Sequence, residues 1–506
     1  MSLSKRIISA LLVAVMGICA LFVGIYARQE EEKNIFDNTT TLHIWYTDEA
    51  LTDHLGSMAV KYNEQYGVRV IPVLQSGLEL LEKINEASYM EDNIPDLFIA
   101  TNDIIEKAYL SGLAIPVDNS DGAVGLLNFP ESAVNAVTYK QEIIGYPFYY
   151  ETSALLYNKT YLKDLAEKNI LAELKAEAEE EKAAAEEASE EEATATEQSE
   201  EEASGEPGQT EAAEFGISAG ELEKMVEEKI PTLIPTTFEK LLEFADNYDA
   251  PENVEAVFKW DVADIFFNYF FAGNYIDAGG VCGDNVNAVD LYNEKAIRAL
   301  KVYQKLSDYF AIDAANVDYN SVIQEFMEGK VVMTTATTDI IGKLETAKEN
   351  GEFSFEYGIA TIPRLTEEME TKGMSVTNAI YINGYSALRA EANSFAKFLA
   401  LEHAGDLYEA TGKVTANKNI LHQNKDLNMF MNEYQDSAPI PKLMATSNLL
   451  IKMEIMFDRI WEGAEVSAQL KQLSEEMMTQ ITGQPYEEKY IQLQEESQEY
   501  IDYYQD

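Results

Sequence analysis

The chain has 506 residues, 46% of them apolar and 10% aromatic, so it can form two or more domains with sizeable cores. It carries 37 basic and 89 acidic residues, a formal net charge of −52 at pH 7. This charge excludes nucleic-acid binding by the bulk of the chain, because phosphate contacts need a basic surface. Two cysteines, Cys19 and Cys282, and four scattered histidines supply neither a disulfide framework nor the spacing of a zinc site. We therefore expect no metal and no cofactor.

The N-terminal 29 residues have the pattern of an export segment. Two basic residues at positions 5–6 precede an uncharged run over 7–26, which as a helix would span about 30 Å, the thickness of bilayer hydrocarbon. The basic pair keeps the short N-terminus in the cytoplasm and places the rest outside. Two outcomes stay open: an uncleaved anchor on the outer face of the cytoplasmic membrane, which we favour, or a cleaved signal that releases a secreted protein. Residues 25–27 fit a cleavage site poorly.

After a polar linker at 30–40, strand-like and helix-like patterns alternate. This alternation predicts βαβ units, and hence a largely parallel sheet with helices on both faces and ligands beyond the carboxyl ends of the strands. The expected strands are 41–46, 68–73 and 94–100, and the expected helices between and after them are 50–65, 78–89 and 103–111.

A glutamate-rich segment interrupts this pattern. Residues 167–214 contain 18 Glu and 3 Lys among 48 residues and almost no large apolar side chains. Such a segment cannot bury enough surface to offset its chain entropy, so we expect solvated helix or disorder. It could be an acidic arm that binds a partner or a tolerated surface insertion, and we favour the insertion because long surface loops are thermodynamically cheap.

The second half is expected to contain few strands. Helices are predicted over 238–248, 261–271 and 294–309, short strands over 331–334 and 357–361, mostly helices after 391, and an acidic, tyrosine-rich C-terminal helix over 486–506.

Motifs for catalysis are absent. The sequence has no phosphate-binding glycine loop and no H-E-x-x-H. Gly216-Ile-Ser218-Ala-Gly220 matches a nucleophile elbow, but glutamate-rich sequence precedes it where the elbow needs a buried strand. We therefore expect that the chain is not an enzyme.

Five segments, in the same order and with similar spacing, resemble the family 1 extracellular solute-binding proteins of ABC importers, the group that contains maltose-binding protein. The best match is Gly145-Tyr-Pro147 followed by Tyr157-Asn158-Lys159. The other four are Pro95–Asp118, Phe326–Thr334, Tyr357–Pro363 and Phe395–Leu399.

The resemblance implies an α/β, two-lobed periplasmic-binding-protein fold (type II-like) with a hinge between the lobes. The chain would cross between lobes near 146–152, 374–378 and 412–419. The implied domains are lobe 1 over 41–147 plus about 378–412, lobe 2 over 148–377 plus about 419–485, and an acidic insertion over 167–230 within lobe 2.

The function that the resemblance implies is capture of a small-molecule solute by hinge closure. We expect a monomeric receptor that holds a carbohydrate, such as an oligosaccharide, in the cleft and delivers it to an ABC permease in the membrane. Two alternatives stay open: a sensor or scaffold with a degenerate cleft, and a binding protein for a cationic solute such as a polyamine.

Candidate ligand-binding residues follow strand ends and crossings. Asp48 is equally well placed to cap a helix, and Tyr149 and Tyr150 should point to opposite faces of one strand. Relatives that bind maltodextrin stack sugars on tryptophans where this chain has Ala100, Asp339 and about Ser447, which argues against maltodextrin specifically. The complete set of candidates is Tyr46, Asp48, Glu49, Asp103, Tyr149, Tyr150, Glu151, Trp260, Tyr269, Thr335 and Asp339.

Overall fold

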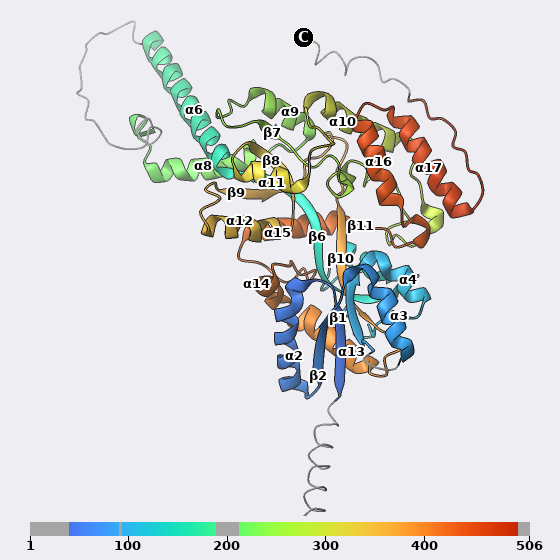
Figure 1. Ribbon diagram of the computed structural model, residues 1–506. Coiled ribbons are helices and arrows are strands. Elements are labelled where there is room, and N and C mark those ends of the chain that lie inside the picture. The colour runs from blue at the N-terminus through green and yellow to red at the C-terminus, as the bar shows by residue number, and fades with distance from the viewer. Residues whose placement is uncertain (1–39, 91–93, 189–211, 494–506) are drawn as a thin grey trace, which may run out of the picture.

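The computed structural model describes residues 40–90, 94–188 and 212–493. Nine strands form one sheet in the order β2-β1-β3-β10-β6-β8-β7, with β11 beside β10 and β9 beside β6, and β4 pairs with β5 separately. Figure 1 shows two lobes that the strands β6 and β10 connect. The predicted export segment lies outside the described residues, and within the described ranges no helix has the length and apolar character needed to cross a membrane.

The lower lobe in Figure 1 contains the first part of the chain. Its strands β1, β2 and β3 are parallel, as the alternating pattern predicts. Its elements are β1 (Thr41–Tyr46), η1 (Glu49–Leu51), α2 (Thr52–Tyr66), β2 (Arg69–Leu74), η2 (Gly77–Glu79), α3 (Leu80–Met90), β3 (Leu97–Thr101), η3 (Asn102–Ile104), α4 (Ile105–Leu110), α5 (Glu131–Val137), β4 (Thr138–Tyr139), β5 (Glu142–Ile143), α13 (Arg389–Lys397), η7 (Phe398–Glu402), η8 (Ala404–Asp406) and α14 (Leu407–Thr411).

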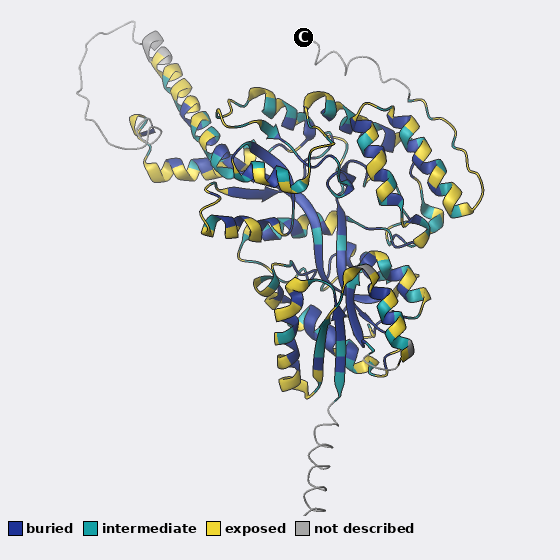
Figure 2. Ribbon diagram, viewed as in Figure 1, coloured by how far each residue is buried: buried dark blue, intermediate teal, exposed yellow. Residues whose placement is uncertain are grey.

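The upper lobe holds most of the helices, and their outer faces are exposed while the strands beneath them are buried (Figure 2). Its elements are α6 (Lys159–Ala188), α8 (Ala219–Leu233), α9 (Phe238–Asn247), β7 (Ala256–Phe258), η4 (Ile265–Phe267), η5 (Tyr269–Phe271), η6 (Val286–Ala288), α10 (Glu294–Tyr309), α11 (Tyr319–Met327), β8 (Val331–Thr337), α12 (Ile340–Glu349), β9 (Tyr357–Ala360), α15 (Lys425–Asp436), β11 (Ala438–Pro439), η9 (Met444–Thr446), α16 (Leu449–Trp461) and α17 (Val466–Thr482).

Two long strands belong to both lobes. The first part of β6 (Gly145–Asn158) pairs antiparallel with β10 (Met374–Ile382), and its second part pairs antiparallel with β8 and β9. The far end of β10 pairs antiparallel with β3. The sheet is therefore mixed rather than largely parallel, because the strands that connect the lobes run against their neighbours.

The helix predicted over 261–271 does not form as one helix, and this prediction was wrong. Two short 3₁₀ helices, η4 and η5, occupy the segment, with Asn268 between them. The buried Asn268 side chain donates to the carbonyl oxygens of Val262 and Asp264, at 2.9 and 2.8 Å, and Asp264 accepts from Phe266 N–H. Such side-chain bonds compete with a regular helix.

The ends of the acidic insertion are ordered and packed. Helix α6 projects from the upper lobe (Figure 1), and α8 packs against its base with Leu222, Val226 and Ile230 buried. Ser218 of the elbow-like motif caps α8 in a capping box with Glu221, which is a structural role. The middle of the insertion, 189–211, lies outside the described residues.

The predicted C-terminal helix is wrong over 486–493, which lack helical structure. This segment lies along the upper lobe instead, where Ile491 N–H donates to the Tyr292 hydroxyl at 2.7 Å and Glu488 N–H donates to Glu475 at 2.9 Å. Bonds from its backbone to side chains replace the intrahelical bonds. Residues 494–506 lie outside the described part.

Helix α15 places two carboxylates against the edge of β9. Asp426 accepts from Ile359 N–H at 3.0 Å, and seven residues later Glu433 accepts from Ile362 N–H at 2.7 Å. Burial raises the pKa of Glu433 to about 7, although the bond from Ile362 opposes this shift. The folded protein therefore binds more protons than the unfolded chain between the ordinary carboxyl pKa and about 7, and its stability must fall as pH rises through that window.

We expect E433Q to be more stable than the wild type at pH 8, by about 1–2 kcal/mol, because glutamine keeps the acceptor oxygen without the charge. Thermal denaturation from pH 4 to pH 8 measures the effect, and the two melting curves should converge toward pH 4. An exposed residue of α12, Glu349, provides the matched control E349Q, which should keep the wild-type pH dependence. A wild-type melting temperature that rises from pH 5 to pH 8 while E433Q stays flat would contradict the assignment.

Candidate functional site

The strand β6 is buried at every residue except Glu151, which is partly exposed. This residue lies where the strand passes from one lobe to the other, opposite Val376 of β10. Its neighbours Tyr149 and Tyr150 point to opposite faces, as strand alternation predicts. Tyr150 stacks in parallel on Tyr434 of α15 with 3.9 Å between ring centroids.

On the other face, four side chains meet in what we call the Lys413 cluster: Asp48, Tyr149, Glu151 and Lys413. The Lys413 Nζ lies 2.9 Å from Asp48 Oδ2 and 3.4 Å from Glu151 Oε1. The Tyr149 hydroxyl donates to the same Asp48 oxygen at 3.1 Å, and Lys413 Nζ lies 5.5 Å from the centre of the Tyr149 ring. The cluster thus joins the loop after β1 to the strand β6 and to the segment that follows α14.

The capping role of Asp48 is confirmed, and its ligand-binding role stays a prediction. Its Oδ1 accepts from Ala50 N–H at 3.1 Å and caps η1, while its Oδ2 belongs to the Lys413 cluster. The cap fixes the carboxylate so that its second oxygen points at the cluster. One side chain therefore caps a helix and takes part in an ion pair at the crossing.

The charges in the Lys413 cluster are set by burial and by one another. Burial of Lys413 works against its charge, but the hydrogen bond to Asp48 and the nearby charge of Glu151 outweigh it, so the pKa of Lys413 is raised. Burial and the Asp48 carboxylate raise the pKa of the Tyr149 hydroxyl as well. The cluster therefore combines the Lys413 ammonium and the Tyr149 hydroxyl with the carboxyl groups of Asp48 and Glu151, which is a mixture of strong donors and acceptors.

Three further candidates lie in the lower lobe, and none contacts the cluster through a described bond. Tyr46 is buried, and its hydroxyl donates to Thr52 at 3.0 Å, which ties β1 to α2. Glu49 is exposed as the first residue of η1. Asp103 follows β3 and accepts from the Thr101 hydroxyl.

Two candidates follow or lie in β8 of the upper lobe. Thr335 is buried, and its hydroxyl has no hydrogen-bond partner among the described residues. Asp339 is exposed and accepts from the hydroxyl of Thr337, whose oxygen also lies 3.0 Å from the Tyr319 hydroxyl. Thr337 pairs with Ser153 of β6, so this end of β8 lies at the crossing.

Trp260 is not available as an aromatic platform. The ring is fully buried and packs against Phe258 and Trp461, with centroid distances of 4.9 and 5.3 Å. Its Nε1–H donates to Asn268 at 2.9 Å, so the polar atom is also satisfied. Trp260 therefore belongs to the core of the upper lobe, and we no longer count it among the candidate ligand-binding residues.

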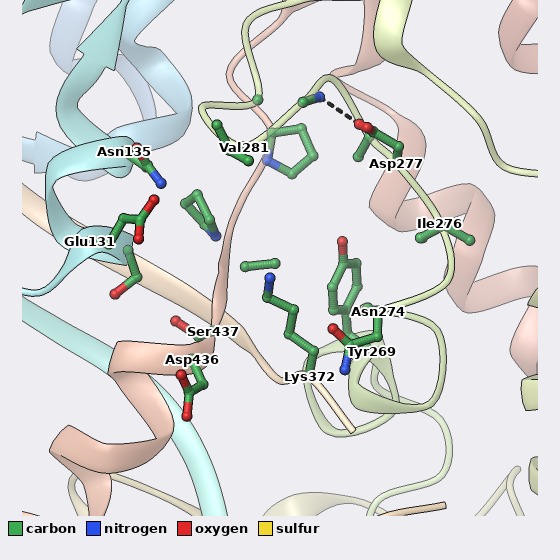
Figure 3. Close-up of a pocket in the computed structure, with 18 of the residues that line it drawn as sticks. Glu131, Asn135, Tyr269, Asn274, Ile276, Asp277, Val281, Lys372, Asp436 and Ser437 are labelled. Atoms are coloured by element: carbon green, nitrogen blue, oxygen red, sulfur yellow. Dashed lines mark hydrogen bonds between the residues drawn. The ribbon is translucent and has the colours of Figure 1, made fainter. Parts of the chain in front are cut away.

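Tyr269 faces a cavity rather than the Lys413 cluster. The cavity has a volume of about 400 Å³ and takes its walls from α5, from 269–283, from Lys372 and from 435–441 (Figure 3). It lies on the Tyr150 face of the crossing strands, because its lining hydroxyls Ser132 and Ser437 both donate to the carbonyl oxygen of Tyr434. Asp48, Tyr149 and Glu151 of the predicted set therefore meet in the Lys413 cluster, whereas Tyr269 lines this cavity.

Lys413 is the site residue that the sequence interpretation missed. It follows Gly412, whose φ of 72° ends α14, and it precedes Thr415, which bridges to Tyr149. The 412–419 segment was expected to cross between the lobes, and its two lysines, Lys413 and Lys418, in so acidic a chain were the available signal. In the described part of the chain, no group of three or more His, Cys, Asp or Glu side chains is placed to hold a metal.

Comparisons with known proteins agree with this geometry. A family model described as bacterial extracellular solute-binding protein matches residues 57–430. No protein of curated function matches in sequence.

Three solved structures show the same fold. The extracellular solute-binding protein from Staphylococcus aureus, in complex with maltose, superposes with a TM-score of 0.66 at 18% identity, covering 88% of this chain and 98% of that one. The maltose-binding periplasmic protein MalE from Listeria monocytogenes, in complex with maltose, gives 0.63 at 17%, covering 89% and 100%. MalX from Streptococcus pneumoniae, in complex with maltopentaose, gives 0.58 at 18%, covering 87% and 99%.

Proposed function

The chain belongs to the bacterial extracellular solute-binding proteins, and from this membership we propose that it captures a carbohydrate between its lobes and delivers it to an ABC permease. The observation that carries the proposal is the Lys413 cluster. It is the place where the crossing strand β6 exposes Glu151, and it gathers donors and acceptors from the loop after β1 and from two crossing segments. The structural neighbours described in complex with maltose or maltopentaose support a saccharide as the solute.

Sugar hydroxyls are both donors and acceptors, so they need both kinds of partner in a binding site. Lys413 Nζ can donate, Glu151 retains a second oxygen that can accept, and Asp48 holds the lysine in place. Ala100 and Asp339 stand where maltodextrin-binding relatives stack tryptophans, so recognition in this chain would depend more on hydrogen bonds than on stacking. This favours an oligosaccharide other than linear maltodextrin.

We propose binding without catalysis. Glycoside hydrolysis needs one carboxyl that gives a proton and another that acts as base or nucleophile. Asp48 and Glu151 instead share the same ammonium, so the geometry suits holding a ligand and not cleaving it.

The remaining expectations stand as proposals. The lobes are 41–147 with about 378–412, and 148–377 with about 419–485. The protein acts as a monomer at the outer face of the membrane, held by residues 1–29 or secreted after their cleavage. A polyamine-binding role or a sensor role for the acidic insertion are the alternatives.

A thermal-shift screen of the purified protein tests the function. A ligand that binds only the native state raises stability by about 2.7 kcal/mol at a hundredfold excess over Kd. We expect an oligosaccharide to raise the melting temperature and polyamines to give no comparable shift. A shift with spermidine and with no saccharide would mean that the solute is a cation and not a sugar. No shift with any solute, together with loss of a protein contact on deleting 167–214, would establish the sensor role.

A further inference from the structure

The cavity on the Tyr150 face has no part in the proposed sugar site, and we propose that it is a second binding site for a small zwitterion, a free α-amino acid or a dipeptide. Its volume of about 400 Å³ lies in the range of small-molecule sites. Its walls come from both lobes, with α5 on one side and the 269–283 loop on the other (Figure 3).

The upper-lobe wall presents a hydroxyl and an ammonium. Tyr269 is 3% exposed, and its side chain stands in the wall of the cavity (Figure 3). Beside it, the Lys372 side chain points into the same space, and no ion pair joins Lys372 to a carboxylate of the described residues (Figure 3). A tyrosine hydroxyl and a lysine ammonium are both hydrogen-bond donors. Together the two groups suit a carboxylate.

The facing wall presents the opposite charge. Glu131 and Asn135 lie on α5, one turn apart, and both line the cavity (Figure 3). Glu131 forms no ion pair with any described residue, so its carboxylate is open to an ammonium. Asp277 lies across the cavity on the 269–283 loop, where it accepts from Gly279 N–H at 2.9 Å, so Glu131 is the principal anion of the α5 wall.

This separation of charge selects the ligand class. A simple organic cation would suit Glu131 but would be repelled by Lys372, and a simple anion would suit Lys372 but be repelled by Glu131 and Asp436, which also lines the cavity. A molecule with an ammonium at one end and a carboxylate at the other matches both walls. The small residues of the lining, among them Gly280, Ala278 and Gly283, leave room for its side chain.

Isothermal titration of the full chain with glycylglycine and with each of the common L-α-amino acids tests the proposal. We expect at least one of them to bind, and its N-acetyl and methyl-ester derivatives, which each lack one charge, to bind at least tenfold more weakly. Equal binding of a blocked derivative would overturn the zwitterion, and the absence of binding by every probe would overturn the site.

Variants then locate the bound molecule. K372M and E131Q should each weaken binding at least tenfold, and the near-isosteric Y269F should weaken it without affecting folding, which circular dichroism checks. E151Q lies in the Lys413 cluster and should leave zwitterion binding unchanged while it weakens sugar binding. If E151Q removes zwitterion binding and Y269F does not, the amino acid occupies the sugar site and the second site is excluded; loss of sugar binding alone bears only on the proposed function.

Discussion

A K413M variant should bind the cognate saccharide at least tenfold more weakly than the wild type. Methionine fills a similar volume but removes the ammonium that Asp48 and Glu151 share at 2.9 and 3.4 Å. The two carboxylates would then face each other without a counter-charge, and the ligand would lose a charged donor, which is worth about 1.5–3 kcal/mol. Each 1.4 kcal/mol corresponds to a factor of ten in Kd.

Titration calorimetry with the saccharide found by thermal shift measures this effect. K413R should recover most of the affinity, because the guanidinium keeps the charge near Asp48. The matched control is K397M, which removes another partly buried lysine of the lower lobe from its 2.7 Å ion pair with Asp121. K397M should bind like the wild type, and a K413M protein that also does so would exclude the Lys413 cluster from the ligand site.

The parts of the fold that the sequence predicted are those governed by local periodicity. The first three strands follow from the alternation of apolar and polar residues, and the helices between them follow from a 3.6-residue apolar period. The same period predicts α10 with its observed bounds, Glu294–Tyr309. The crossing strand was found from the resemblance to a family and not from periodicity, because β6 is buried at nearly every position and shows no alternation.

The two misses share one physical cause, which is that side chains bind backbone groups that a helix would use. In the 261–271 segment the competitor is local, because the Asn268 amide binds the carbonyl oxygens of Val262 and Asp264. The C-terminal segment has helical composition, yet Tyr292 and Glu475 bind its backbone in a non-helical form. Those two partners lie outside the C-terminal segment, so no pattern within it reports them.

The candidate site was predicted only in part, because some of its residues lie at strand ends or crossings and one does not. Asp48, Tyr149 and Glu151 follow strand ends or crossings, where topology alone brings side chains together. Lys413 lies in a loop, and only the fold brings it to them. The cavity on the Tyr150 face could not be predicted, since its walls come from four segments spread from residue 131 to residue 441.

Gly273 should be among the least tolerant positions in the chain, and G273A should lower the stability of the upper lobe by about 3 kcal/mol. A Cβ at this position would lie 2.1 Å from the carbonyl oxygen of Lys372 and 2.9 Å from Cε1 of Tyr269. Its φ is outside the left-handed region, so the effect would come from this contact alone. Relief requires moving the backbone before β10 away from the 269–283 loop, and overpacking of this kind typically costs about 1–3 kcal/mol, occasionally more.

Thermal and urea denaturation measure the loss, and G342A supplies the matched control. Gly342 lies inside α12, where an added Cβ meets nothing within 4 Å, so alanine there should stabilise the protein by about 0.5–1 kcal/mol. The same clash displaces Lys372 and Tyr269, so G273A should also lose zwitterion binding under conditions where it remains folded. If G273A has the melting temperature of the wild type, the backbone of Lys372 does not approach the 269–283 loop as closely as the structure has it. The positions of Tyr269 and Lys372 in the wall of the cavity would then be wrong.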